Sequence, residues 1–318
     1  MGATCWGLLA PLLLLCCAAK HPALGKELDL PGYKGMGLER GSQNHLVLRG
    51  QVNNQPATFI IDTASAITFL RGDRAGKLGV VASGGDYVIA PGKSLQRAYV
   101  DLRAGAMDFG KIVIGLVDPA QRAGTLPADG SIGLDLLRRY KAVINCRTKE
   151  IFFKTGASSM DLGATTKAQG FARIPIREDR HGYLMVACSL GGKSGRMMVD
   201  TGAFVTIMNE TALRYRGVAG ENSNLTAGNF DGKVQRLQVV TIDNLKIGPV
   251  AIAARELAMM NLTGEAGPRK SLRMGFSYVE AIERRDIGGE VFFGLLGNDL
   301  LNHLHAIIDL ESMTVFLK

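Results

Sequence analysis

The sequence predicts an all-β protein of two similar lobes, each a small, orthogonally packed β-barrel-like unit with one short helix. Three observations lead to this fold class. Short runs of Val, Ile and Leu alternate with polar turns, and the chain contains 40 glycines, which is typical of many short strands. Sequence blocks from the first half of the chain recur in the second half. A chain of 318 residues is also long enough for two domains that each bury a core.

Two pairs of matched blocks define the recurrence. Phe59–Ala64 aligns without a gap with Met197–Gly202, and both blocks are apolar strands that end in an acidic loop. Further along each copy, Ile132–Leu137 aligns with Leu296–Leu301. A repeat unit that spans nearly half of the chain indicates a duplicated domain and not an array of short repeats.

The second copy is longer between its two blocks than the first. The stretch from Gly202 to Leu296 contains more residues than the stretch from Ala64 to Ile132. We expect the additional residues between Leu257 and Glu290, with a short helix over Leu272–Arg285.

The stretch before the second copy is rich in Gly, Ala, Ser and Thr, which predicts a linker. The expected organisation is a leader at 1–19, a first lobe at 40–155, a linker at 156–170 and a second lobe at 171–318.

The first residues have the pattern of a secretory signal peptide. Leu8–Leu15 is an apolar run that is too short to span a bilayer, and small residues follow it, so cleavage is expected after Ala19 or Ala23. No Lys or Arg precedes the run, and a lipid anchor on Cys16 or Cys17, or an uncleaved anchor, remains an alternative. The predicted location is the periplasm or the outside of the cell, with a lipid-anchored envelope protein as the variant.

Composition argues against several other classes of protein. The formal net charge is +8, but the Lys and Arg residues are spread singly, so we expect a solvated basic surface and no nucleic-acid binding. Beyond the leader only Cys146 and Cys188 remain, and they either pair or lie as two separate buried thiols. No spacing of Cys and His predicts a metal site, and no motif predicts a cofactor.

The acidic loops carry the candidate chemistry. Asp62 and Asp200 occupy equivalent positions in the two copies, each directly after an apolar strand. Two carboxyl groups placed close together cannot both ionise cheaply, so they share one proton over a wide pH range. The ionised group can take a proton from water while the protonated group donates to an amide carbonyl, and no covalent intermediate is needed. Asp135 and Asp299, in contrast, are expected only to cap the helices that they precede.

These residues resemble the aspartic proteases of the pepsin and retropepsin group, specifically bacterial proteins with two retropepsin-like lobes in one chain. The resemblance covers about residues 40–155 and 171–318. It implies that Asp62 and Asp200 are the catalytic acids of Asp-Thr-Gly-like loops. It also implies that Thr63 and Thr201 cross-bond between the lobes as the scaffold of the dyad, together with Ala64 and Gly202.

The same resemblance implies a hairpin flap over the substrate in each lobe, and Tyr87 and Phe230 are the candidate flap residues. Two positions depart from the family pattern: Ala64 stands where glycine is usual, and Ser131 stands at an apolar position before Gly133. The alanine adds a methyl group beside the dyad and raises the question of how efficient the site is.

The resemblance implies an aspartic-type endopeptidase that acts on peptides or proteins. Because both aspartates lie in one chain, a monomer is sufficient to build the site. The alternative hypothesis is a weakly active or inactive peptide-binding protein of the cell envelope. Ala64 and the longer second copy favour this alternative.

Overall fold

A computed structural model describes residues 30–90, 93–118, 126–157, 161–214, 217–228, 234–262 and 290–318. The expected leader at 1–19, the expected helix at Leu272–Arg285 and the flap candidate Phe230 lie outside the described residues. Within the described part, no helix is long and apolar enough to cross a membrane.

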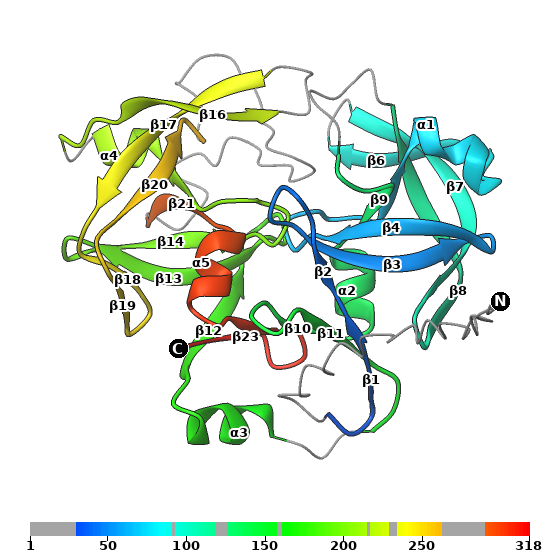
Figure 1. Ribbon diagram of the computed structural model, residues 1–318, viewed down its shortest axis with the longest axis horizontal. Helices are drawn as coiled ribbons and strands as arrows, with labels where there is room; N and C mark the ends of the chain where they lie inside the picture. Colours follow the sequence, from blue (N-terminus) through cyan, green and yellow to red (C-terminus); the bar gives the residue numbers. More distant parts are fainter. Residues whose placement is uncertain are drawn as a thin grey trace, which may run out of the picture.

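The first lobe is a closed barrel (Figure 1). Its strands are β2 (Glu39–Arg40), β3 (Leu46–Val52), β4 (Gln55–Ile61), β5 (Phe69–Arg71), β6 (Ala82–Ala90), β7 (Lys93–Ala104), β8 (Met107–Val117) and β9 (Gly130–Ile132). They follow the order β2-β3-β4-β9-β5-β8-β7-β6, and β3 also pairs with β7. That additional pairing joins the ends of the row β3-β4-β9-β5-β8-β7, so these strands form a ring.

The second lobe repeats this order of pairing. Its strands are β13 (Leu184–Leu190), β14 (Lys193–Val199), β15 (Ile207–Asn209), β16 (Glu221–Gly228), β17 (Val234–Ile242), β18 (Leu245–Ile247), β19 (Val250–Ile252), β20 (Arg255–Met260) and β21 (Val291–Leu296). The path is β13-β14-β21-β15-β20-β17-β16, and β18 pairs with β13 and β19. The two lobes are therefore similar all-β units related by pseudo-twofold symmetry, as the sequence predicts.

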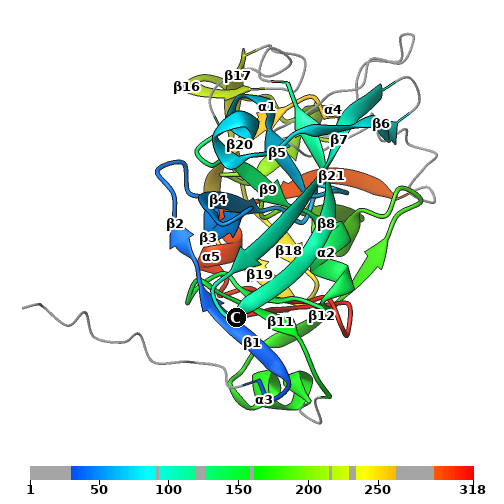
Figure 2. The same ribbon diagram turned by 90° about the vertical axis from the view of Figure 1, so that its right-hand side faces the viewer.

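An interlobe sheet joins the two lobes. Its strands are β1 (Tyr33–Gly37), β10 (Val143–Asn145), β11 (Glu150–Lys154), β12 (Ala172–Glu178), β22 (Ile307–Asp309) and β23 (Thr314–Leu317), in the order β1-β11-β10-β22-β23-β12. The lobes meet where β10 pairs with β22, with Ile144 opposite Ile308. Figure 2 shows β1, β11 and β12 below the lobes. β1 precedes residue 40, where the sequence analysis starts the first lobe.

The strands that lead to the acidic loops are buried on both faces. Phe59 and Ile61 of β4 belong to the large central core cluster, whereas Ile60 belongs to a separate apolar cluster on the other face. In β14, Met197 and Val199 likewise face the central core, and Met198 faces a second local cluster. Because successive side chains of a strand point to opposite faces, this double burial explains why both strands end in uninterrupted apolar runs.

Tight turns connect the hairpins that contain these strands. Asn53 and Asn54 both have positive φ angles between β3 and β4, and Gly191 and Gly192 do so between β13 and β14. Two consecutive residues with positive φ are the signature of a type I′ hairpin turn, for which Asn and Gly are preferred. Tight polar turns therefore close both hairpins.

The helices are short. They are α1 (Gly72–Ala75), the 3₁₀ turn η1 (Gly76–Leu78), α2 (Leu134–Arg139), α3 (Leu162–Ala168), α4 (Glu210–Arg214) and α5 (Asn298–His303). α2 and α5 are the predicted helices after Gly133 and Gly297, and α1 and α4 add a second short helix to each lobe. α3 lies in the predicted linker, where the Asp161 side chain accepts a hydrogen bond from Ala164 N and Leu162 is buried. The N-cap and the buried leucine explain a helix that loop-like composition did not predict.

Cys146 and Cys188 are both free and buried, so the chain keeps two separate thiols and no disulfide joins them. Burial raises the pKa of each thiol to about 12. The thiolate is the nucleophilic form of cysteine, and a raised pKa keeps both thiols protonated at neutral pH.

We therefore expect neither cysteine to react with iodoacetamide at pH 8 in the native protein, and both to react in guanidinium chloride. Mass spectrometry of the peptides that contain Cys146 and Cys188 measures the alkylation. Rapid alkylation of either residue in the folded protein would contradict the burial described above.

Candidate active site

The two acidic loops begin where β4 and β14 end (Figure 1). Each loop is held by the parallel strand beside it: Asp62 N donates to Ile132 O at 3.1 Å, and Asp200 N donates to Leu296 O at 3.0 Å. Both aspartates are almost completely buried, with 2% and 1% of their surface exposed. The fold thus removes two carboxyl groups from water at equivalent positions of its two lobes.

Thr63 and Thr201 exchange hydrogen bonds across the lobe boundary. Thr63 N donates to Thr201 Oγ1 at 3.0 Å, and Thr201 N donates to Thr63 Oγ1 at the same distance. Each hydroxyl also donates into the other lobe, Thr63 Oγ1 to Val199 O at 2.8 Å and Thr201 Oγ1 to Ile61 O at 2.7 Å. All four bonds are buried, and the accepting carbonyls directly precede the aspartates. These bonds fix the two loops against each other.

The contact between Gly202 and Asp62 shows how close the loops are. A methyl group added at Gly202 would lie 2.4 Å from Asp62 Cγ and 2.4 Å from its Oδ1, well inside van der Waals contact. Glycine at this position therefore lets the second loop approach the first aspartate. Asp62, Thr63 and Ala64 are brought together with Thr201 and Gly202 in one buried cluster of loops.

Ala64 occupies the position where the other loop has glycine. Its N–H donates to Asp62 Oδ1 at 2.9 Å, it is not among the residues with positive φ, and its side chain is fully buried. The methyl group belongs to an apolar cluster that is otherwise formed by the second lobe, including Tyr183, Met198 and Leu295. The additional methyl group thus has a place to pack, and the backbone of the first loop carries no strain at this residue.

Backbone amides surround both carboxyl groups. Asp200 Oδ1 accepts hydrogen bonds from Gly202 N at 2.8 Å and from Ala203 N at 3.0 Å. Asp62 is in a comparable position, but its surroundings favour the protonated form. Burial raises the pKa of Asp62, and the nearby Asp200 carboxylate raises it further, against the opposing effect of the Ala64 and Ser65 amides. The pair is therefore arranged to hold one proton between two carboxyl groups.

A second layer of contacts supports each loop in the same way. Thr68 Oγ1 donates to Asp135 Oδ1 at 2.7 Å, and Thr206 Oγ1 donates to Asp299 Oδ1 at 2.6 Å. Both aspartates lie inside the first turn of their helices, whose N-cap residues are glycines. Neither aspartate is the N-cap residue of its helix, although Asp135 Oδ1 does accept from Leu136 N of the first turn at 2.8 Å. The capping expectation missed that both carboxylates bind the threonines beyond the acidic loops.

Of the two predicted flap residues, Tyr87 lies in the described part of the chain. It is on β6 of the β6–β7 hairpin, where its half-buried ring packs on the apolar cluster that contains Ile60, two residues before Asp62. Burial, and to a smaller extent Asp135, raises the pKa of the Tyr87 hydroxyl. Tyr87 thus packs on the apolar cluster that includes the strand leading to the first loop.

Two residues that the sequence did not single out hold the second loop. Asn298 is fully buried, and its Nδ2 donates to Thr201 O at 2.6 Å and to Ala203 O at 3.1 Å. His45 of the first lobe is 6% exposed, and its Nε2 lies 3.0 Å from Gly202 O. The corresponding positions of the other copy hold Leu134 and Tyr183, so a search for what the copies share passes over both residues.

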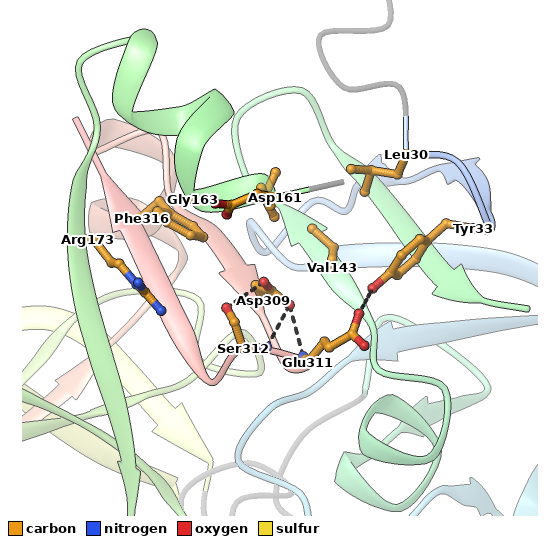
Figure 3. Close-up of a pocket in the computed structure, with 11 residues that line it drawn as sticks. Leu30, Tyr33, Val143, Asp161, Gly163, Arg173, Asp309, Glu311, Ser312 and Phe316 are labelled. Atoms are coloured by element: carbon orange, nitrogen blue, oxygen red, sulfur yellow. Dashed lines mark hydrogen bonds between the residues drawn. The ribbon is translucent and has the colours of Figure 1, made fainter. Parts of the chain in front are cut away.

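A partly open pocket lies away from these loops (Figure 3). It encloses about 150 Å³ between α3 and the interlobe sheet, and none of the predicted site residues lines it. Its acidic groups are engaged: Tyr33 donates to Glu311 at 2.6 Å, and Asp309 accepts from Glu311 N and Ser312 N. Within the described residues, no group of His, Cys, Asp and Glu side chains is arranged to hold a metal ion.

The crossed threonine bonds give a direct test of how the loops are held. The Thr63→Val substitution leaves Thr201 N without its acceptor and Val199 O without its donor. We expect a loss of about 2 kcal/mol or more in the free energy of unfolding, because each buried group left unsatisfied costs about 1–3 kcal/mol. Thr63→Ser keeps the hydroxyl and is the matched control, with a cost of about 1 kcal/mol for the lost methyl group. Chemical denaturation measures both variants, and equal losses would contradict the role given to the hydroxyl.

Comparison with known proteins agrees with this arrangement. Residues 186–303, which include Asp200 and α5, match the family described as gag-polyprotein putative aspartyl protease. No curated protein sequence matches the chain. Among solved structures, the aspartic proteinase from Irpex lacteus is similar, with 15% sequence identity over 90% of this chain and 96% of that one and a TM-score of 0.50. The chain thus has the two-lobed all-β fold of a pepsin-like aspartic proteinase, and its residues 186–303 are similar to an aspartyl protease family.

Proposed function

We propose that this protein is an aspartic-type endopeptidase in which Asp62 and Asp200 activate a water molecule between them. The observation that carries the proposal is the pair of buried aspartates in two loops that are joined by reciprocal threonine hydrogen bonds. Burying two carboxyl groups next to each other is costly unless they share a proton. A fold that retains the arrangement has a chemical use for it, and water-dependent hydrolysis is the use that needs no further group.

The proposed reaction begins with water between the carboxyl groups. The ionised carboxylate takes a proton from the water, whose oxygen attacks the carbonyl carbon of the peptide bond, while the protonated carboxyl donates its proton to the carbonyl oxygen. The resulting tetrahedral diol collapses when the carboxyl that took the water proton passes it to the nitrogen, the ionised carboxylate takes a proton from one diol hydroxyl, and the C–N bond breaks. The products are a carboxylic acid and an amine, and the dyad returns to its singly protonated state.

The substrate is proposed to be a peptide or protein segment that lies across the two loops. Tyr87 and Phe230 are proposed as flap residues above it, which for Tyr87 is supported by its place on the β6–β7 hairpin. Both aspartates come from one chain, so a dimer is not needed to form the site. The finer classification, a bacterial protein with two retropepsin-like lobes, is part of the proposal, as is action in the periplasm or outside the cell, which rests on the leader-like residues 1–19 alone.

Peptide cleavage tests the proposal. We expect the protein to cleave a peptide library at mildly acidic pH, with inhibition by pepstatin, and we expect Asp62→Asn and Asp200→Asn to lower kcat by about 10²–10⁴-fold. Asp108→Asn is the matched control, because this aspartate is exposed on β8 and its variant should retain full activity.

The assay should cover pH 3–8, since the rate is expected to fall when the dyad gains a second proton and when it loses its last one. Folded wild-type protein that cleaves no peptide over this range would refute the endopeptidase. Binding of an extended peptide that is unchanged by Asp62→Asn would instead support the envelope peptide-binding protein.

The raised pKa of Asp62 also predicts how stability depends on pH. Its carboxyl binds a proton more tightly in the folded than in the unfolded chain, whose aspartates titrate near pH 4. The contribution of this group to stability is complete below that pH and is lost as the pH rises through the folded-state pKa.

Asp62→Asn removes this loss, because asparagine stays neutral. We therefore expect its Tm to rise relative to wild type between pH 4 and pH 8. Asp108→Asn is again the control: a hydrogen bond from Gly110 N lowers the pKa of Asp108, so this variant should gain nothing as the pH rises. Thermal unfolding at several pH values measures the difference, and a constant offset between Asp62→Asn and wild type would contradict the raised pKa.

A further inference from the structure

A segment of the first lobe contacts the second acidic loop through side chains. Asn44 Nδ2 donates to Phe204 O at 2.9 Å, and His45 Nε2 lies 3.0 Å from Gly202 O. Since a carbonyl oxygen can only accept, the ring nitrogen that bonds to it must carry the proton. The neighbouring Arg40 fixes this segment by donating to Asn44 O at 2.8 Å and to Asn44 Oδ1 at 2.9 Å.

His45 binds the same peptide unit that holds Asp200. The carbonyl of the Gly202–Ala203 peptide accepts from His45, and the N–H of that peptide donates to Asp200 Oδ1 at 3.0 Å. Hydrogen bonds in such a chain polarise one another, so a donor at the carbonyl strengthens the donor at the amide. The imidazole is therefore connected to the carboxylate through one rigid, planar group.

The opposite contact is built differently. In the gapless alignment of the two copies around the acidic loops, Asn44 and His45 correspond to Gly182 and Tyr183. Gly182 has no side chain, and Tyr183 is 5% exposed within the apolar cluster that also contains Ala64. The first lobe thus holds the second acidic loop by polar side chains, whereas the second lobe surrounds the first loop with apolar ones.

We propose that His45 is a positioning residue that, through the Gly202–Ala203 peptide, makes Asp200 the ionised member of the dyad and leaves the proton on Asp62. The inference rests on the proposed endopeptidase function. Asp200 then takes the proton from water, and Asp62 donates its proton to the carbonyl of the substrate. In the segment that carries His45, the cationic side chain of Arg40 donates to Asn44 O and to Cys146 O.

The kinetic test compares three variants in the peptide-cleavage assay. His45→Phe removes the donor and keeps a ring, and kcat should fall about tenfold or more while KM stays within about twofold. His45→Gln keeps an N–H donor without an imidazole and should recover most of kcat. Gln43→Ala changes an exposed side chain of the same segment and should change kcat by less than about twofold. A folded His45→Phe variant with wild-type kcat would overturn the proposal.

A second measurement uses the wild-type protein and needs no activity. Carboxyl ¹³C NMR should show that Asp200 ionises before Asp62, and ¹⁵N NMR should place the proton of neutral His45 on Nε2. Where His45→Phe folds, its Asp200 carboxyl should titrate at higher pH than in wild type. If Asp62 ionises first, or if neutral His45 carries its proton on Nδ1, the inference is wrong even in an active protease. If wild type cleaves nothing, the proposed function fails, and these NMR results still decide the role of His45.

Discussion

The candidate site depends on the hydrogen bonds that Thr63 and Thr201 exchange. Each hydroxyl accepts from the amide of the other threonine and donates to the carbonyl that precedes the other aspartate. Each carboxyl group is therefore positioned by the opposite lobe as much as by its own strand. Because these bonds are buried, separation of the loops would leave polar groups unsatisfied at a cost of about 1–3 kcal/mol each. The pairing of β10 with β22 supplies a further connection between the lobes.

This construction conflicts with the usual distribution of charge in proteins. Two carboxyl groups are kept out of water, where an ionised group is costly, and the protein compensates with amide donors to each carboxylate and with one retained proton. The same desolvation that raises the pKa of Asp62 favours its protonated form, which the proposed reaction uses as its proton donor. Burial of Asp62 therefore costs stability when the group ionises, while the proposed reaction needs the same buried carboxyl. Such a conflict is common where a polar site is assembled for function.

The sequence predicted the parts of the fold that the two lobes have in common. Both copies end a doubly buried strand in an aspartate, and this recurrence identified Phe59–Asp62 and Met197–Asp200. The short helices after Gly133 and Gly297 were predicted because their motif also recurs. His45 and Asn298 were not predicted, because the matching positions of the other copy hold different residues, Tyr183 and Leu134. The role of Asp135 was misread because its partner Thr68 is distant in sequence and reaches it only in the folded barrel. Local composition likewise indicated a linker at 156–170. Composition could not reveal that Leu162, which lies within this stretch, is buried.

The methyl group of Ala64 has a consequence for how such a site can change over time. In the first loop it is buried among side chains of the second lobe, whereas a methyl group at Gly202 would collide with the Asp62 carboxyl. A homodimer with one acidic loop per subunit carries every substitution on both sides of its axis. An alanine at this position would therefore occur in both loops of such a dimer, including the one where its methyl group collides with the carboxyl. A single chain with two lobes is free of that constraint. Its halves can diverge residue by residue. A peptide has distinct N- and C-terminal directions, and its two ends then contact lobes whose surfaces differ.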